Sequence, residues 1–521
     1  MLAAAALLSI GPALATGPAA ASRYVLITIL HTNDLHGSVM PRDGVGGLAR
    51  VAALVRQTRM DMPNVVLLDG GDIIHGTPED YLSGGLATIS AMNAAGYDAA
   101  ATGNHEYDFG LPTLAGAASA AAFPLLAANV RAAPGGQWDR VRPYVVMDVD
   151  GVRLGIIGLT TLDTISLHWP NSIKDIVVED PFAAAKRIMP EVVAQTDVVV
   201  VLSHLGAEND LLLAAAVPGI DFIVGGHSHT AITERRWVKD ILIAQTGAYA
   251  RSLGRIDFIV RLGEDGGKVV SINGKVRDWS RPENAPLGKV YPAGPLIPVD
   301  GSVPEDAAVR AAYLPFRRHA DDRLAEVLGE LPKEGIPGRR AGQWASPAAD
   351  LVADAVREFA QAEVALVDAN GVGERGLPGG RVTLKDVFDL IGGYTRQHIV
   401  VARFRGRDLI AAINAGFAKR QAVNLAISGA AAEVEVIGRI PRVTAMTIGE
   451  MPLEPEREYV VAAQAYVMMD MMETAPSAVV VSEFAETTRE ALARYLKGRS
   501  KTAVPAGPRL RERQPTGVAD G

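Results

Sequence analysis

The sequence predicts an α/β protein of two domains, and three observations support this fold class. The chain has 521 residues, more than one hydrophobic core usually serves, since domains commonly contain about 100 to 200 residues. From Tyr24 to about Asp257, short β-branched or apolar runs alternate with longer Ala- and Leu-rich segments, which is the pattern of a layered α/β domain. Residues 280–302 are dense in Pro and Gly and predict a connection between two domains.

The composition excludes several classes of function. With 48% hydrophobic and 21% charged residues, the chain is typical of a globular protein that buries sizeable cores. The net charge of −8 argues against nucleic acid as a partner, because that task needs concentrated Lys and Arg. The absence of cysteine excludes disulfides, thiolate catalysis and Cys-bound metals. Any metal must therefore be held by His, Asp, Glu or Asn.

Residues 1–22 carry no charge and resemble a secretory signal peptide, with an apolar core, a Gly-Pro break and small residues suited to cleavage. Pro12 and Pro18 interrupt the run, so a stable membrane span, which needs about 20 apolar residues, is not expected. The sequence thus predicts a periplasmic or secreted protein. The alternative is a flexible, Ala-rich N-terminus on a cytosolic protein.

The first domain is predicted to span residues 23–285. Its expected elements are the strands Tyr24–Leu30, Asn64–Leu68, Leu154–Ile157, Asp197–Leu202 and Asp221–Val224 and the helices Gly47–Thr58 and Leu86–Ala95. Residues 97–101 read as a further short buried strand that leads into a loop.

The rest of the chain is predicted to hold a connector, a second domain and a tail. Residues 286–331 are expected to form a linker and a connector helix over Pro304–Glu330, because Glu305 and Asp306 place negative charge at the helix start. Residues 332–498 read as a mixed α/β substrate-binding domain, and residues 499–521 as a loose tail.

Five apolar runs of the first domain end in side chains that bind metals or move protons. In order, the candidates are Asp34 and His36, then Asp72, then Asn104 and His105, then His204, and finally His227 and His229. Groups beyond the carboxyl ends of parallel strands converge on one crevice, so we expect these side chains to lie together.

The spacing of these residues predicts a metal centre. In extended backbone, residues i and i+2 point the same way, so Asp34 with His36, and His227 with His229, are each expected to face one point. Carboxylates, imidazoles and an amide suit first-row divalent ions such as zinc, manganese, cobalt or iron. Without His105, the candidate ligands are Asp34, His36, Asp72, Asn104, His204, His227 and His229. Seven ligands are too many for one tetrahedral ion and suit two ions about 3.5 to 4 Å apart with a bridging carboxylate.

The motifs H-T-N-D-L-H-G, G-D-I-I-H-G-T, G-N-H-E-Y-D-F-G, S-H-L-G and G-G-H-S-H occur in this order. They resemble the 5′-nucleotidase family of calcineurin-like metallophosphoesterases, of the secreted bacterial 5′-nucleotidase and UDP-sugar hydrolase type. The resemblance implies a four-layer α/β/β/α domain with a dinuclear metal centre, joined by a helix to a mixed α/β substrate domain. It implies that Asp34, His36, Asp72 and His229 hold one ion, and that Asp72, Asn104, His204 and His227 hold the other, with Asp72 bridging.

The resemblance also implies that His105 and Asp108 form a catalytic dyad. The residues themselves agree, because a carboxylate three positions after a histidine can orient the imidazole and stabilise its cation. The implied mechanism is in-line attack on phosphorus by a metal-activated hydroxide, with His105 stabilising the developing charge. Glu106 is interpreted as structural. Of the other histidines, His31 is expected to support a ligand, His75 and His168 lie near the motifs, and His319 and His398 receive no role.

In the second domain, residues 368–375 resemble the Asn-Gly-Gly-Gly-Ile-Arg segment whose arginine meets the substrate in this family. Asn370, Gly371 and Arg375 match it, and a guanidinium there can bind a phosphate or carboxylate. The alternative is a surface arginine in a Gly-rich turn.

The two aromatic rings that hold a nucleotide base in this family are not in their expected places. Thr395 stands where the first ring is expected, and the glycines around the second are replaced by a Met-rich run. Tyr394 and Tyr466 are predicted to substitute, since stacking needs only a π face. The methionines themselves read more simply as core residues.

The sequence as a whole predicts an exported metal-dependent phosphoester hydrolase that acts on a small molecule, with 5′-nucleotidase activity on nucleoside monophosphates as the leading reading. One alternative is a relative that acts on 2′,3′-cyclic nucleotides, nucleotide sugars or a sulfur-bound ester. A second alternative is a relative that binds a ligand without turnover.

Overall fold

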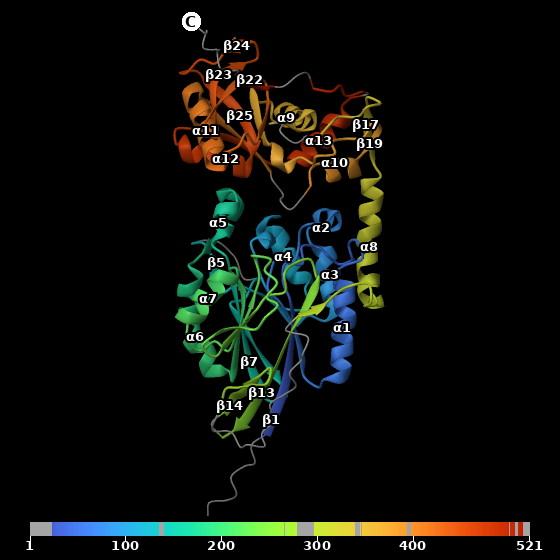
Figure 1. Cartoon of the computed structure of the whole chain (residues 1–521), viewed down its shortest axis with the longest axis vertical. Coiled ribbons are helices and arrows are strands. Elements are labelled where there is room, and N and C mark those ends of the chain that lie inside the picture. Colours follow the sequence, from blue (N-terminus) through green and yellow to red (C-terminus); the bar gives the residue numbers. More distant parts are fainter. Residues whose placement is uncertain are drawn as a thin grey trace, which may run out of the picture.

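The computed structural model describes residues 23–134, 140–264, 266–278, 296–338, 344, 346–392, 398–499, 501–505 and 509–513. The expected signal peptide (residues 1–22) and Tyr394 lie outside these residues. The chain forms two lobes, and helix α8 runs along one side between them (Figure 1).

The first sheet of the N-terminal lobe has the strand order β15-β14-β13-β1-β2-β3-β4, with β16 paired to β13. Strands β1 to β4 are parallel, and β13 runs antiparallel to β1. The bounds are β1 Arg23–Thr32, β2 Val65–Asp69, β3 Ala99–Ala101, β4 Leu125–Leu126, β13 Ser252–Gly263, β14 Gly266–Ile272, β15 Lys275–Val276 and β16 Leu296–Pro298.

The second sheet has the order β11-β12-β10-β9-β7-β6, and its strands β7, β9, β10 and β12 are parallel. The bounds are β6 Tyr144–Val149, β7 Val152–Thr160, β9 Val198–His204, β10 Phe222–Gly225, β11 Arg236–Val238 and β12 Ile241–Ala244. A separate pair is formed by β5 Val130–Ala132 and β8 Ile176–Val178. The predicted strands of this lobe are all present, with bounds that differ by at most three residues.

Helices cover the outer face of each sheet, which gives four layers. Ile29 of β1 faces the core between the two sheets, whereas its neighbour Leu30 faces the helices, because successive strand side chains point to opposite faces. Strands buried on both faces need apolar residues at nearly every position. The helices are α1 Leu48–Asp61, α2 Pro78–Ser83, α3 Leu86–Ala95 and α4 Leu111–Ala120, followed by α5 Asp163–Leu167, α6 Pro181–Gln195 and α7 Ala207–Ala216. The predicted fold class is confirmed.

The C-terminal lobe is built on a five-stranded sheet of order β21-β18-β25-β20-β26. Its strands are β18 Val364–Asp368, β20 His398–Arg405, β21 Leu425–Ser428, β25 Glu458–Gln464 and β26 Val479–Thr487. One face packs against α9 Pro347–Ala360, α10 Leu384–Leu390 and α13 Thr488–Lys497, and the other against α11 Gly406–Arg420 and α12 Ala465–Thr474. Met468 and Met471 of α12 are buried in the second of these cores, as the core interpretation of the methionines expects.

The connector helix is shorter than predicted. Helix α8 spans Ala307–Leu324, and the residues after it form β17, Val327–Leu331, which pairs with β19, Gly380–Thr383. Asp306 lies before the helix and accepts hydrogen bonds from the backbone amides of Ala308 and Val309, so it is the N-cap rather than a helical residue. The extension to Glu330 was wrong because a β-branched residue and a glycine follow Leu324 and favour strand pairing over helix.

The predicted loose tail also contains ordered structure. Residues Leu510–Glu512 form β27, which runs parallel to β22 at the edge of a four-stranded sheet of order β24-β23-β22-β27. Arg509 anchors this segment, because its guanidinium bonds the Asp354 carboxylate at 2.7 Å and the Ile427 carbonyl at 2.9 Å. The other bounds are β22 Ala430–Ile437, β23 Ile440–Ile448 and β24 Met451–Pro452.

Among the described residues, no helix combines the length and apolar character needed to cross a membrane.

Candidate functional site

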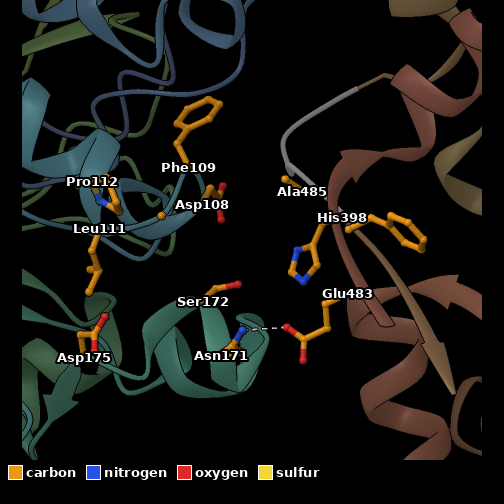
Figure 2. Close-up of a pocket in the computed structure, with 12 residues that line it drawn as sticks. Asp108, Phe109, Leu111, Pro112, Asn171, Ser172, Asp175, His398, Glu483 and Ala485 are labelled. Carbon is orange, nitrogen blue, oxygen red and sulfur yellow. Dashed lines mark hydrogen bonds between the residues drawn. The ribbon is translucent and has the colours of Figure 1, made fainter. Parts of the chain in front are cut away.

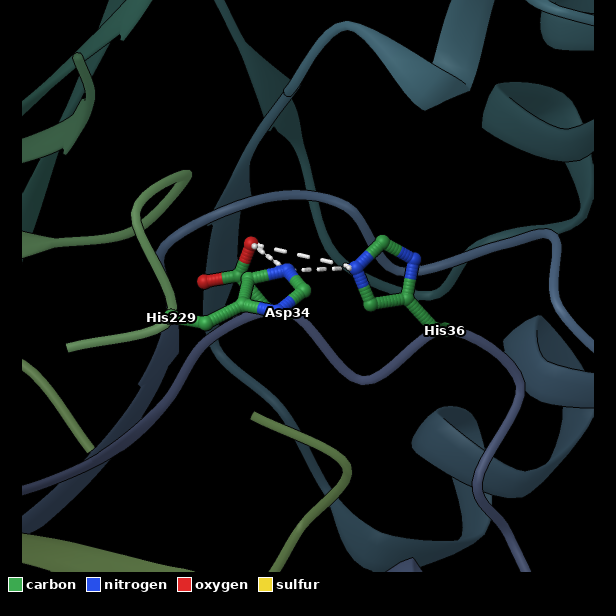
Figure 3. A group of neighbouring side chains, drawn as sticks. All are labelled: Asp34, His36 and His229. Carbon is green, nitrogen blue, oxygen red and sulfur yellow. Dashed lines mark hydrogen bonds and ion pairs between the residues drawn. The ribbon is translucent and has the colours of Figure 1, made fainter. Parts of the chain in front are cut away.

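The carboxyl ends of the parallel strands bring the first group of candidate ligands together. Asp34, His36 and His229 each offer a ligand atom within 4.8 Å of the others. His36 Nε2 lies 3.0 Å from His229 Nε2, and Asp34 Oδ1 lies 3.4 Å from His229 Nε2 and 3.9 Å from His36 Nε2. Figure 3 shows these three side chains pointing toward one another.

A second group forms beside the first from Asp72, His204 and His227, again with ligand atoms within 4.8 Å of one another. Asp72 Oδ2 lies 3.1 Å from His204 Nε2. Asn104 joins this group, because its Oδ1 lies 3.1 Å from His227 Nδ1. All seven candidate ligands therefore meet at one edge of the two sheets.

Asp72 lies between the two groups. The same oxygen that faces His204, Oδ2, is 3.9 Å from His36 Nε2 of the first group. The other oxygen, Oδ1, accepts the backbone amide of His105 at 3.0 Å. This position is the one expected of a bridging carboxylate.

The backbone at the ligands differs from the extended form that the sequence predicted. Asp34, His36, Asp72, His227 and His229 have φ between 45° and 73°, the left-handed region that non-glycine residues seldom adopt. Strained backbone of this kind clusters at functional sites. Asp34 and His36 still converge, but His227 and His229 belong to different groups, so the expectation that this pair faces one point was wrong.

Glu106 holds the loops that carry the ligands. Its buried carboxylate accepts the backbone amides of Asp72 at 3.0 Å, Ile73 at 2.8 Å, Ile74 at 3.2 Å and Gly103 at 2.6 Å. Burial, followed by the nearby Asp72 carboxylate, raises the pKa of Glu106 to about 7. These contacts are structural, as the sequence interpretation proposed.

Two further residues, Asn33 and Asp163, support the candidate ligands. Asn33 donates to Asp34 Oδ2 at 2.6 Å, and its own amide oxygen accepts from the backbone and hydroxyl of Thr246. Asp163 of α5 places Oδ2 3.0 Å from His227 Nε2. Asn33 stands inside the motif H-T-N-D-L-H-G, but its bond to Thr246 joins residues 213 positions apart. Asp163 lies in none of the motifs and is 64 positions from His227, so the sequence did not indicate either role.

The donor set fits two divalent ions. His204 Nδ1 lies 2.8 Å from the Gly70 carbonyl. With Nδ1–H donating to that carbonyl, a bound ion would replace the proton on Nε2, which faces Asp72. Burial would lower the pKa of His204, but the Asp72 carboxylate outweighs it and raises that pKa to about 10. The site therefore favours positive charge where a metal would bind.

The expected dyad is formed. His105 Nδ1 lies 2.6 Å from Asp108 Oδ2. His105 begins the short 3₁₀ turn η1 (His105–Tyr107), and Asp108 follows directly after it. Burial would lower the pKa of His105, but the carboxylates of Asp108 and Asp72 outweigh it and raise that pKa to about 10. These two carboxylates therefore favour the cationic form of the imidazole. His105 also lies within 4.8 Å of ligand atoms of His36 and Asp72.

His31 does not support a ligand, contrary to the sequence expectation. It lies inside β1, is 0% exposed, and packs against Gly254 of β13. Neither ring nitrogen has a hydrogen bond among the described residues, and burial lowers the pKa of His31 to about 3. The strand continues through Thr32, so His31 is a neutral core residue rather than the first loop residue.

In the C-terminal lobe, Asp368 gathers two of the predicted substrate residues. Its Oδ1 accepts the backbone amide of Asn370 at 3.0 Å, and its Oδ2 accepts the Tyr466 hydroxyl at 2.8 Å. Gly371 ends the turn η3, and Arg375 is exposed four residues later. Asn370 and Tyr466 are thus neighbours although 96 positions separate them in the chain.

A cavity of about 400 Å³ opens between the lobes beside the dyad. Asp108, Leu111 and Pro112 line it from the N-terminal lobe, and His398 and Glu483 from the C-terminal lobe (Figure 2). Figure 2 also shows the hydrogen bond of 2.8 Å from Asn171 to Glu483, which spans the two lobes. Of the dyad, Asp108 lines this cavity, whereas His105 and the seven candidate ligands do not.

Comparisons with known proteins agree with this architecture. Residues 27–231 match the calcineurin-like phosphoesterase family, and residues 327–474 match the 5′-nucleotidase C-terminal domain. The chain is 30% identical over 404 residues to Protein UshA of Yersinia enterocolitica, covering 69% of this chain and 71% of that protein. It is 29% identical over 424 residues to a 5′-nucleotidase of Vibrio cholerae, covering 72% and 73%.

Solved structures extend the likeness over both lobes. The 5′-nucleotidase precursor from Thermus thermophilus aligns with a TM-score of 0.64 and 25% identity, covering 94% of this chain and 99% of that one. A putative 5′-nucleotidase from Staphylococcus aureus aligns with a TM-score of 0.73 and 20% identity, covering 94% and 100%, and shows the same fold. The chain therefore belongs to the 5′-nucleotidase family of calcineurin-like metallophosphoesterases and is a hydrolase of phosphoric esters.

Proposed function

We propose that this protein is an exported phosphoester hydrolase that uses two divalent metal ions and releases phosphate from nucleoside 5′-monophosphates. The observation that carries the proposal is the meeting of seven metal-binding side chains with the His105–Asp108 pair at one edge of the sheets. Family membership supports divalent metals as cofactors. Asp34, His36, Asp72 and His229 would hold one ion, and Asp72, Asn104, His204 and His227 the other.

The two ions, when bound, supply the charge that activates a water nucleophile and stabilises the phosphoryl oxygens. The chain supplies the rest. His105 presents a cationic imidazole whose Nδ1 is held by Asp108, so its Nε2–H is free to donate to a phosphoryl oxygen as negative charge develops there. Glu106 keeps the loop of Asp72 fixed, so the site does not have to reorganise during reaction.

The nucleoside is proposed to lie against the C-terminal lobe. Asn370, Gly371 and Arg375 would contact the ribose or phosphate, and Tyr394 and Tyr466 would provide the π faces for the base. The support for Tyr466 is its fixed hydroxyl, bonded to Asp368 beside Asn370. A ring held in this way loses little freedom when a base stacks on it.

The test is turnover of a substrate panel by metal-restored protein. The panel contains AMP, a 2′,3′-cyclic nucleotide, a UDP-sugar, an aryl phosphate and an aryl phosphodiester. Selective cleavage of AMP supports the proposal. Selective cleavage of another ester keeps the metal chemistry and replaces the substrate, whereas no cleavage of any ester would refute the function.

Tyr466→Ala is expected to raise KM for AMP by about tenfold, since base stacking contributes about 1 to 3 kcal/mol, and to leave KM for the aryl phosphate unchanged. Tyr466→Phe keeps the ring and is the matched control, expected to stay close to wild type. Equal effects of Tyr466→Ala on both substrates would show that the ring does not contact a base.

Export is proposed from the uncharged, apolar composition of residues 1–22. Mass spectrometry of the protein recovered outside the cytoplasm is expected to show cleavage after Ala15 or Ala21. An intact chain found only in the cytoplasm would contradict this part of the proposal.

A further inference from the structure

His168, which lies outside the motifs quoted above, contacts the dyad. His168 Nε2 lies 2.9 Å from Asp108 Oδ1, the oxygen that His105 does not use. His168 Nδ1 lies 2.8 Å from the carbonyl of Thr164. Both partner atoms are oxygens that accept hydrogen bonds. The ring is buried and anchored at its two ends.

These contacts fix the orientation of the Asp108 carboxylate. His105 and His168 each hold one carboxylate oxygen, and His75 places Nδ1 3.4 Å from Oδ2. A carboxylate held by one hydrogen bond can rotate about its Cβ–Cγ bond, whereas one held at both oxygens cannot. The orientation of His105 toward the substrate therefore depends on His168 through Asp108.

The residues that follow His168 reach the other lobe. Trp169 is only 7% exposed and packs in the apolar core formed by the C-terminal lobe, with its ring 6.5 Å from that of His398. Asn171 donates to Glu483 of β26 at 2.8 Å. Only Trp169 and Pro170 thus separate His168, which contacts Asp108, from Asn171, which bonds the C-terminal lobe.

We propose that His168 is a positioning residue for the His105–Asp108 dyad, and that the segment 168–171 makes this positioning depend on contact with the C-terminal lobe. The inference rests on the proposed hydrolase function. Contact of the lobes fixes Trp169 and Asn171, which holds His168 against Asp108 and leaves His105 correctly oriented. When that contact is lost, Oδ1 of Asp108 loses its partner and His105 gains freedom to rotate.

The first experiment compares His168→Ala and His168→Gln on the aryl phosphate. Glutamine can place its Nε2 near the position of the histidine Nε2 and keep the donor to Asp108, whereas alanine removes it. We expect His168→Ala to lower kcat by about 10- to 100-fold with KM within about twofold, because small misplacement of a catalytic group has effects of this size. His168→Gln should recover most of that loss. His319→Ala, an exposed histidine on α8, is the control and should match wild type.

A double-mutant cycle separates positioning from general destabilisation. If His168 acts through Asp108, His168→Ala added to Asp108→Asn should lower kcat by less than threefold further. A purely structural role would give the full loss again in the double variant and no recovery with glutamine, which would overturn the proposal. Unfolding temperatures of all variants identify any that fail to fold.

The dependence on the C-terminal lobe is tested with Trp169→Ala and Asn171→Ala. We expect both to lower kcat, with little added effect in the His168→Ala background. Unchanged kcat in both variants would refute this coupling. An inactive wild-type protein would refute the proposed function, whereas an active wild type with fully active His168→Ala would refute only the positioning role.

Discussion

Replacing Asp72 by alanine is expected to lower kcat/KM on the aryl phosphate by at least about 1000-fold and to reduce bound metal from two ions per chain to one or none. The reason is its place between the groups, 3.1 Å from His204 Nε2 and 3.9 Å from His36 Nε2. Steady-state kinetics and elemental analysis of the dialysed protein measure the two effects.

Asp61→Ala is the matched control, because Asp61 is an exposed carboxylate at the end of α1 and should leave both quantities unchanged. An Asp72→Ala protein with two tightly bound ions would show that Asp72 does not bridge them. Full activity in that variant would contradict the location of the active site.

His105→Ala is expected to lower kcat by about 100- to 1000-fold while KM changes little and both ions remain bound. The neighbouring carboxylates favour the cationic form of His105, which Asp108 holds in place, so its removal is expected to take charge from the transition state rather than a ligand from a metal. The same kinetics and metal analysis apply. Added imidazole should restore part of the activity by occupying the space left by the ring.

The metal content of His105→Ala distinguishes a charge-donating role of His105 from a metal-binding one. Because His105 lies within 4.8 Å of ligand atoms of His36 and Asp72, it could serve as a ligand instead of a charge donor. Loss of one ion in His105→Ala would establish that role and remove His105 from the proposed dyad. Retention of both ions with unchanged kcat would show that the dyad does not act in the rate-limiting step.

Much of the site could be predicted because two general rules place it. Parallel strands end at one edge of a sheet, so Asp72 and His204, which are far apart in the chain, had to meet once their strands were recognised. The donor types then limited the chemistry. These inferences depend on residue type and on strand position, both of which are visible in the sequence.

The features that the sequence did not predict depend on tertiary contacts, which leave no local pattern in the sequence. The left-handed backbone at His227 and His229 is held by the surrounding loops, so an extended geometry was the natural but incorrect expectation. Asp163 and His168 reach the site from a segment between two strands, and only the packing of that segment shows their roles. The end of α8 at Leu324 likewise reflects pairing of β17 with a strand about 50 positions later.

Strand β27 has a consequence for handling the protein. By pairing with β22 it covers an edge whose end carries the exposed apolar side chains of Val436 and Ile437. In a chain shortened before Arg509, the backbone amides and carbonyls of β22 that pair with β27 would lose their partners. Exposed strand edges of this kind promote association between sheets. Strand β27 is therefore expected to limit aggregation of the folded protein, although it lies outside the candidate site.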